Sequence, residues 1–134
     1  MRIILVLAFA GCVAPEVGAP PAERCVSADS DPAQRVSYTG DIVPLFARCV
    51  QCHSPAGQTA GGLDLTTYDG LRTGGERYRD GVVVEGQPCA SGLVDKLGPA
   101  PMLGGRMPAS GPPFFSDAER QLVADWIFEG ADPR

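Results

Sequence analysis

Apolar residues recur at three- and four-residue steps in the segment that follows Ser37, at Ile42, Leu45, Phe46 and Cys49. This spacing predicts a helix that buries one face, and we place it within residues 37–48. Thr39 is the expected N-cap, and Asp41 suits the positive end of the helix dipole. Because proline fits only the first turn of a helix, Pro44 favours a start later than Thr39.

A second helical pattern lies near the end of the sequence. Ser116 and Glu119 have the spacing of a capping box, in which each side chain bonds the other residue's backbone N–H. An apolar stripe follows at Leu122, Val123, Trp126 and Ile127. Gly130 supplies the left-handed position at which many helices end. We therefore predict a helix between Ser116 and Gly130 that packs its stripe against the first helix.

The region between these helices is punctuated by glycine, with clusters at residues 59–62 and 73–75. We expect loops there, with a turn of helix over residues 68–72 and a short extended piece at residues 82–84. Ser91 is a candidate N-cap for a small third helix that ends near Leu97. The glycine clusters lack the order of a phosphate-binding loop.

The first residues indicate export from the cytoplasm. Arg2 precedes an apolar run at residues 3–10, which is too short to span a membrane and has the length of a signal-peptide core. We assign residues 1–11 to a signal peptide. Gly11 and Cys12 resemble the end of a bacterial lipobox, where the cysteine is acylated, so Cys12 is the expected site of a lipid anchor.

The next segment differs in composition from the rest of the chain. Residues 12–35 are rich in Pro, Ala, Ser and acidic residues and contain few large apolar side chains. Such a segment cannot bury enough surface to fold alone, so we expect a flexible tether. Residues 36–134 then form a single small domain.

The most specific motif is C-V-Q-C-H at residues 49–53. C-x-x-C-H is the spacing at which haem c is attached: Cys49 and Cys52 form thioethers with the two vinyl groups, and His53 binds the iron. A redox dithiol should lie in a strand-helix-strand pattern, which is not visible here. A structural zinc needs further closely spaced ligands, whereas the other cysteines are scattered singly.

His53 is the only histidine, so the second axial ligand of the iron must be a different residue type. Methionine is the common partner of histidine in electron-carrying cytochromes, and it raises the reduction potential. Met107 lies between glycines and Pro108, a context that can present its sulfur from an extended loop. Met102 is the alternative, and both methionines could instead be apolar filler. Arg106 is the candidate contact for a haem propionate.

Cysteine counting adds one expectation. The chain has five cysteines; if Cys12 carries lipid and Cys49 and Cys52 carry haem, then Cys25 and Cys89 remain. In an oxidising compartment this pair can form a disulfide that joins the N-terminal segment to the haem domain.

The sequence resembles the planctomycete-type branch of class I cytochrome c domains over nearly the whole folded part. The resemblance rests on D-I-x-P at 41–44, C-x-x-C-H at 49–53, G-G-L-x-L at 61–65, V-V-x-G-x-P at 83–88, R-M-P at 106–108 and W-I-x-x-G-A at 126–131. It implies His53 and Met107 as axial ligands. It also implies a mainly α fold, a small cytochrome c fold of about three helices and glycine-rich loops around one covalently bound haem. Cys89 departs from the family pattern.

The charge of the chain bears on its partners. The formal net charge is −5 and no basic patch is visible, which argues against nucleic acid and favours a basic redox partner. No catalytic base or nucleophile is visible, so we expect a periplasmic, lipid-anchored electron carrier and not an enzyme. Its expected partners are redox proteins, including a membrane-bound oxidoreductase or dehydrogenase. The alternatives are a haem-containing gas or redox sensor and a structural haem subunit of a larger membrane oxidoreductase.

Overall fold

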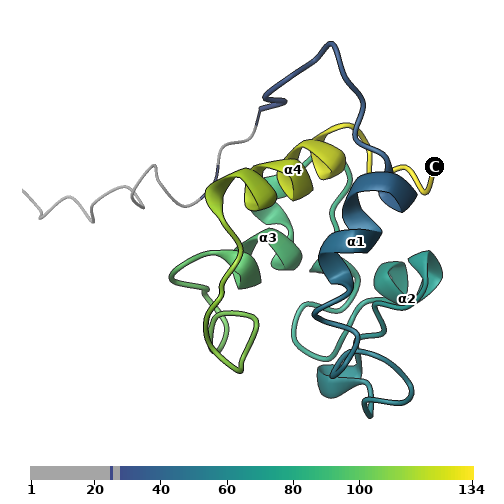
Figure 1. The fold of residues 1–134 in the computed structure, drawn as a ribbon, viewed down its shortest axis with the longest axis vertical. Coiled ribbons are helices and arrows are strands. Elements are labelled where there is room, and N and C mark those ends of the chain that lie inside the picture. The colour runs from purple at the N-terminus through teal and green to yellow at the C-terminus, as the bar shows by residue number, and fades with distance from the viewer. Residues whose placement is uncertain (1–24, 26–27) are drawn as a thin grey trace, which may run out of the picture.

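A computed structural model describes Cys25 and residues 28–134 (Figure 1). The predicted signal peptide, Cys12 and most of the predicted tether lie outside the described residues. Within the described part, α-helices and single helical turns are joined by loops, and no β-strand is formed. None of the described helices has the length and apolar character needed to span a membrane.

The first helical segment begins with a π-helical turn, Tyr38–Ile42, and continues as α1, Val43–Phe46. The prediction that Thr39 is the N-cap is wrong. Ser37 holds that position, where its hydroxyl accepts a hydrogen bond from the Gly40 N–H at 3.0 Å. The helical segment thus starts before Thr39 and not after it as Pro44 suggests; Pro44 is the second residue of α1, directly after the π-helical turn.

Helix α4, Asp117–Phe128, has the predicted start and end. Ser116 and Glu119 form the reciprocal capping box, and Gly130 has the positive φ of 103° that only glycine adopts without cost. The predicted apolar stripe faces the core, where Val123, Trp126 and Ile127 are fully buried. The local sequence pattern therefore determines this helix.

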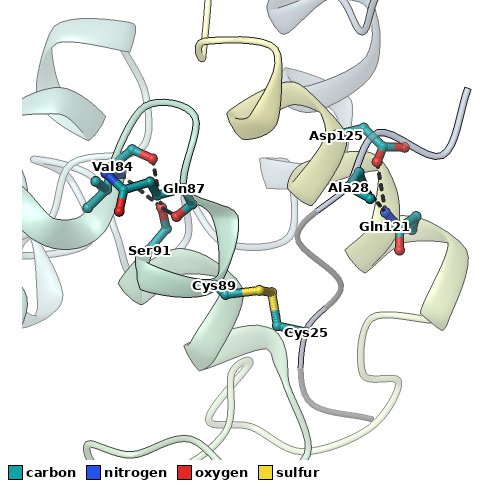
Figure 2. The surroundings of a disulfide bond; sticks show 8 residues. All are labelled: Cys25, Ala28, Val84, Gln87, Cys89, Ser91, Gln121 and Asp125. Atoms are coloured by element: carbon teal, nitrogen blue, oxygen red, sulfur yellow. Dashed lines mark hydrogen bonds between the residues drawn. A yellow bond between two sulfur atoms is a disulfide. The ribbon is translucent and has the colours of Figure 1, made fainter. Parts of the chain in front are cut away.

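The middle of the chain contains two short helices, α2 at Tyr68–Thr73 and α3 at Gly92–Leu97. Ser91 precedes α3 as predicted, but its hydroxyl bonds the backbone of Val84 and Gln87 instead of capping the helix (Figure 2). The predicted extended piece at residues 82–84 is only partly correct, because Val82 closes a 3₁₀ turn that begins at Asp80.

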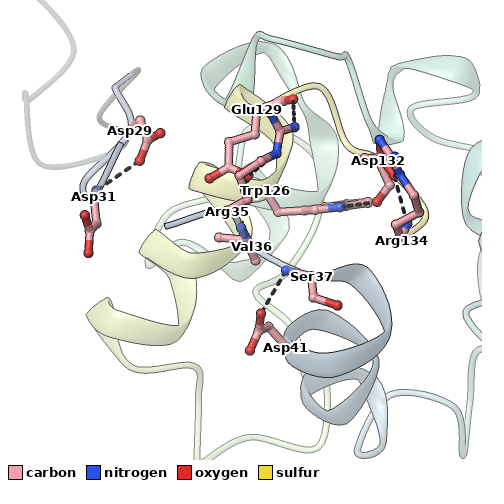
Figure 3. A network of polar contacts seen from close by, with 10 residues as sticks. All are labelled: Asp29, Asp31, Arg35, Val36, Ser37, Asp41, Trp126, Glu129, Asp132 and Arg134. Atoms are coloured by element: carbon pink, nitrogen blue, oxygen red, sulfur yellow. Dashed lines mark hydrogen bonds and ion pairs between the residues drawn. The ribbon is translucent and has the colours of Figure 1, made fainter. Parts of the chain in front are cut away.

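The main core lies where α4 crosses α3 and the π-helical turn (Figure 1). The Trp126 ring lies 5.4 Å from the Tyr38 ring, and its indole N–H donates to the Asp132 carbonyl at 2.8 Å (Figure 3). The end of the chain closes over this core, since the Arg134 carbonyl accepts from the Tyr38 N–H at 2.7 Å. This part of the domain is filled by its own side chains.

The predicted disulfide between Cys25 and Cys89 is confirmed, with its Cα atoms 5.5 Å apart (Figure 2). The chain that follows Cys25 also bonds to α4. The Ser30 N–H and hydroxyl both donate to the carboxylate of Asp125, which is buried, and Gln121 donates to the same group at 2.7 Å. These donors satisfy a buried acidic side chain.

A second set of contacts holds residues just after this segment against the end of α4. The Glu129 carboxylate accepts from the Val36 N–H at 3.0 Å, and the Glu129 carbonyl accepts from the Arg35 guanidinium at 3.0 Å (Figure 3). Residues 28–35 therefore lie along α4, although the sequence places them in the predicted tether.

Candidate haem-binding cavity

A cavity of about 390 Å³ opens between the loop after α1, the loop before α3 and the loop that follows α3. Most of its wall is apolar, with contributions from Phe46, Leu63, Leu65, Val82, Leu93 and Leu97. Its size is within the range of about 300–1,000 Å³ that is typical of ligand and cofactor sites. Such a wall suits a largely apolar ligand.

Gly75 allows the backbone to approach closely at this cavity, and Gly61 supplies a positive φ of 64°. Gly75 lies against the loop at Gly61, where a Cβ atom on Gly75 would come within 2.8 Å of the Gly61 carbonyl oxygen. Both glycines line the cavity. The glycine-rich segments therefore serve as tight turns in its wall, which is the role that the sequence suggests for them.

The C-x-x-C-H motif lies in the turns that follow α1. The sequence suggests that the last turn of the helix carries Cys49, but α1 ends at Phe46. The Cys49 N–H donates to the Phe46 carbonyl at 2.7 Å and the His53 N–H donates to the Cys49 carbonyl at 2.9 Å, so the motif forms one compact unit. Cys49 and His53 line the cavity, whereas Cys52 is exposed.

Met107 lines the same cavity from the loop after α3, and its N–H donates to the Lys96 carbonyl at 2.8 Å. Met102 is 72% exposed to solvent. The fold thus brings Met107 and His53 from distant parts of the sequence to one cavity. It does not bring Met102 there.

The imidazole of His53 has an unusual environment. Its Nδ1 atom is buried and has no hydrogen-bond partner among the described residues. A buried polar atom without a partner is costly, so such an atom beside a cavity points to a bound group. One free thiol, an imidazole and a thioether line the apolar cavity, and the second free thiol, Cys52, lies three residues after Cys49. These are the donors that a c-type haem uses, so the residues fit that group.

The alternative roles of a C-x-x-C pair, a redox dithiol and a structural zinc site, fit this structure less well. Burial raises the pKa of the Cys49 thiol, whereas reactive dithiols have a lowered pKa. The described residues also contain no group of three metal-binding side chains of the His, Cys, Asp or Glu type. A redox dithiol and a structural zinc site are both disfavoured in this part of the chain.

Polar residues in the cavity wall were not predicted from the sequence. Arg77 and Lys96 place two cations in the wall, and burial and the charge of Arg77 both lower the pKa of Lys96. The hydroxyl of Tyr78 donates to Asp95 at 2.5 Å. These residues come from segments far apart in the sequence, and no local motif marks them.

Arg106, the residue expected to contact a propionate, is occupied elsewhere. Its guanidinium donates to the Leu97 and Phe115 carbonyls, both at 3.2 Å, and lies over the ring of Phe114. It does not line the cavity. Arg77 and Lys96 are the cations that do.

The comparisons with known proteins agree with this geometry. Residues 49–110 match the family model described as planctomycete cytochrome C. The matched segment begins at the first cysteine of the C-x-x-C-H motif and includes Met107. No curated protein and no solved structure matches the chain.

Proposed function

We propose that this chain, which carries a planctomycete-type cytochrome c domain with a haem-based role in electron transfer, is a monohaem carrier of single electrons. In this proposal, Cys49 and Cys52 would hold the haem covalently, and His53 and Met107 would bind its iron. The bound haem would supply a reversible one-electron change at iron. The described residues supply attachment, ligands and an apolar enclosure.

The observation that carries the proposal is the meeting of His53 and Met107 at one apolar cavity. A thioether opposite an imidazole favours the reduced iron and raises the reduction potential. It also fills the coordination position that an enzyme or a gas sensor needs to keep open. The arrangement therefore supports an electron carrier over either alternative.

We also propose that the protein is exported to the periplasm and anchored by a lipid on Cys12. The signal-like apolar run and the lipobox-like Gly11 and Cys12 support this proposal. The Cys25–Cys89 disulfide adds support, since such bonds persist in oxidising compartments. With this anchor, the carrier would exchange electrons with redox proteins at the membrane, such as an oxidoreductase or dehydrogenase.

The charge distribution suggests how such a partner docks. Five arginines of the described chain form ion pairs, namely Arg35, Arg48, Arg72, Arg120 and Arg134. The other cations of the described part have no ion-pair partner there: Arg77 and Lys96 in the cavity wall, and Arg79 and Arg106 on the adjoining loops. Net charge favours a basic partner; the cavity wall itself combines the cations Arg77 and Lys96 with the anion Glu76.

The test is the optical spectrum of protein that is exported alongside a haem-ligation system. Wild-type protein should contain covalent haem and show the far-red band of sulfur bound to ferric iron. Met107→Ala should abolish that band and lower the reduction potential by on the order of 0.1 V, a fraction of the range of about 0.8 V that axial ligands set. Met102→Ala is the matched control and should change neither.

Carbon monoxide provides a second readout. The reduced wild-type spectrum should not shift with carbon monoxide under native conditions, because Met107 occupies the site, whereas Met107→Ala should shift. A far-red band that survives Met107→Ala but disappears in Met102→Ala would contradict the ligand assignment. A shift in the wild type would favour a sensor.

A further inference from the structure

We propose that the last turn of α3 fixes the position of Met107, and that Lys96 and Asp95 are positioning residues for this ligand. The inference rests on the proposed function, because it concerns the sulfur that binds the iron. Neither residue belongs to the C-x-x-C-H motif or to the apolar stripe of a helix. Their contacts, described next, assign them this role.

Lys96 bonds the Met107 loop, residues 98–107, at three points. Its carbonyl accepts from the Met107 N–H at 2.8 Å. Its ammonium group donates to the Leu103 carbonyl at 3.0 Å and to the Gly105 carbonyl. A lysine that points to solvent makes no such contacts, and Lys96 has no ion-pair partner in the described chain. Its ammonium group is bonded to the backbone of the loop instead.

Asp95 holds the same loop at an earlier point. Both of its carboxylate oxygens accept from the Met102 N–H, at 3.1 and 2.9 Å, and Oδ2 also accepts from the Tyr78 hydroxyl. Tyr78 in turn lies tightly against α3, because a Cβ atom on Gly92 would come within 2.2 Å of its ring. The carboxylate is therefore fixed by a residue of the cavity wall.

The Met107 loop has little structure of its own. It contains no helix or strand, Gly104 has a positive φ of 72°, and Met102 and Leu103 are exposed. Most of its hydrogen bonds run to the last turn of α3. A loop without an apolar anchor at its tip depends on such bonds for its conformation, so α3 determines where the sulfur of Met107 lies.

This role differs from a general electrostatic one. If Lys96 acts only through its positive charge, then removal of another nearby cation should have a comparable effect. Arg79 provides this comparison, since it is an exposed cation that follows Tyr78 of the cavity wall in sequence, and its side chain makes no hydrogen bond within the described chain. The two residues carry the same charge and differ in their contacts with the loop.

The experiment uses the holoprotein and two readouts during guanidinium titration. The far-red sulfur-to-iron band reports Met107 ligation, and the fluorescence of Trp126, the single tryptophan, reports unfolding of the main core. Lys96→Met should move loss of the band to a lower guanidinium concentration and move the Trp126 transition less. Lys96→Arg, which retains donors, should recover part of the shift. Arg79→Met should leave the separation between the two transitions unchanged.

Asp95→Asn is the second variant if Lys96→Met does not incorporate haem, and it should also shift the band more than the fluorescence. The inference is overturned if the band moves only together with the Trp126 transition, or if Arg79→Met acts as strongly as Lys96→Met. A wild-type holoprotein without the band would instead overturn Met107 ligation itself, a different result that is visible before any substitution.

Discussion

The two sides of this domain are built differently. Where α4 meets α3 and the π-helical turn, side chains fill the interior, and Trp126 and Ile127 are fully buried. Ion pairs surround this side, including Arg48 with Glu119 and Arg35 with Glu129. On the other side, apolar residues face a cavity of about 390 Å³, and the cations beside it have no ion-pair partner in the described chain.

This difference indicates which side of the domain is packed by the polypeptide's own side chains. Burial of apolar side chains is the main driving force of folding, and a cavity wall without a neighbour loses packing contacts on one face. The α4 side is therefore packed by its own side chains, but in a domain this small it needs the cavity side to be filled as well before the fold is stable. For the cavity side, we propose that haem fills the cavity and bonds to Cys49, Cys52, His53 and Met107.

The largest expected effect comes from removing the cofactor while leaving the α4 side intact. The double variant Cys49→Ala with Cys52→Ala should bind no covalent haem. Because a ligand that binds only the folded state stabilises it, the variant should lose the cooperative thermal transition of the holoprotein, as followed by circular dichroism. A haem-free variant that melts cooperatively at the wild-type temperature would show that the fold does not depend on haem in the cavity.

The next effect concerns the disulfide on the α4 side. Cys25→Ser with Cys89→Ser removes a link between residues 64 positions apart, and loop-closure entropy predicts a loss of about 4 kcal/mol in the free energy of unfolding. Guanidinium titration of the holoprotein measures it. The far-red band should persist in native buffer, since neither cysteine touches the cavity. Loss of the band there would show that the two sides are coupled.

A smaller effect is expected at the start of α4. Ser116→Ala removes the hydroxyl that accepts from the Glu119 N–H and should cost about 1 kcal/mol of stability, as N-cap substitutions do. Ser116→Asp is the matched control, because aspartate also caps helices. Equal destabilisation by both variants in a denaturant titration would argue against the capping role.

The smallest effect at neutral pH is expected for Tyr78 in the cavity wall. Burial, followed by the hydrogen bond to Asp95, raises the pKa of Tyr78 to about 12 from an ordinary value near 10. The folded state favours the neutral phenol, so this stability is present below pH 10 and is lost as pH rises toward 12. Tyr78→Phe should show a shallower fall in stability over that range. An identical slope in both proteins would contradict the assignment.

Local patterns predict the parts of the fold that local chemistry determines. The capping box, the apolar stripe and Gly130 define α4 within the sequence itself, and C-x-x-C-H marks the cofactor chemistry without any knowledge of the fold. The choice of Met107 over Met102 rests on neighbouring glycines and proline, and the structure places Met107 at the cavity. These signals need no distant partner.

The missed features depend on contacts that no sequence motif marks. In the sequence, nothing distinguishes Lys96 from an ordinary lysine on a helix. Only the structure shows that its ammonium group bonds carbonyls of the Met107 loop. Arg106 stands beside Met107 in sequence, yet its guanidinium turns to Leu97 and Phe115. Ser37 and Thr39 are both good N-cap residues, and the structure selects Ser37, whose hydroxyl accepts from the Gly40 N–H and whose own N–H donates to the Asp41 carboxylate at 2.8 Å.

We propose above that the cavity holds one haem attached through Cys49 and Cys52. The most direct measurement is the mass of the tryptic peptide that runs from Cys49 to Arg72, taken from exported protein made alongside a haem-ligation system. We expect this peptide to carry the mass of one haem, bound through both cysteines. A peptide of unmodified mass with two free thiols would contradict it.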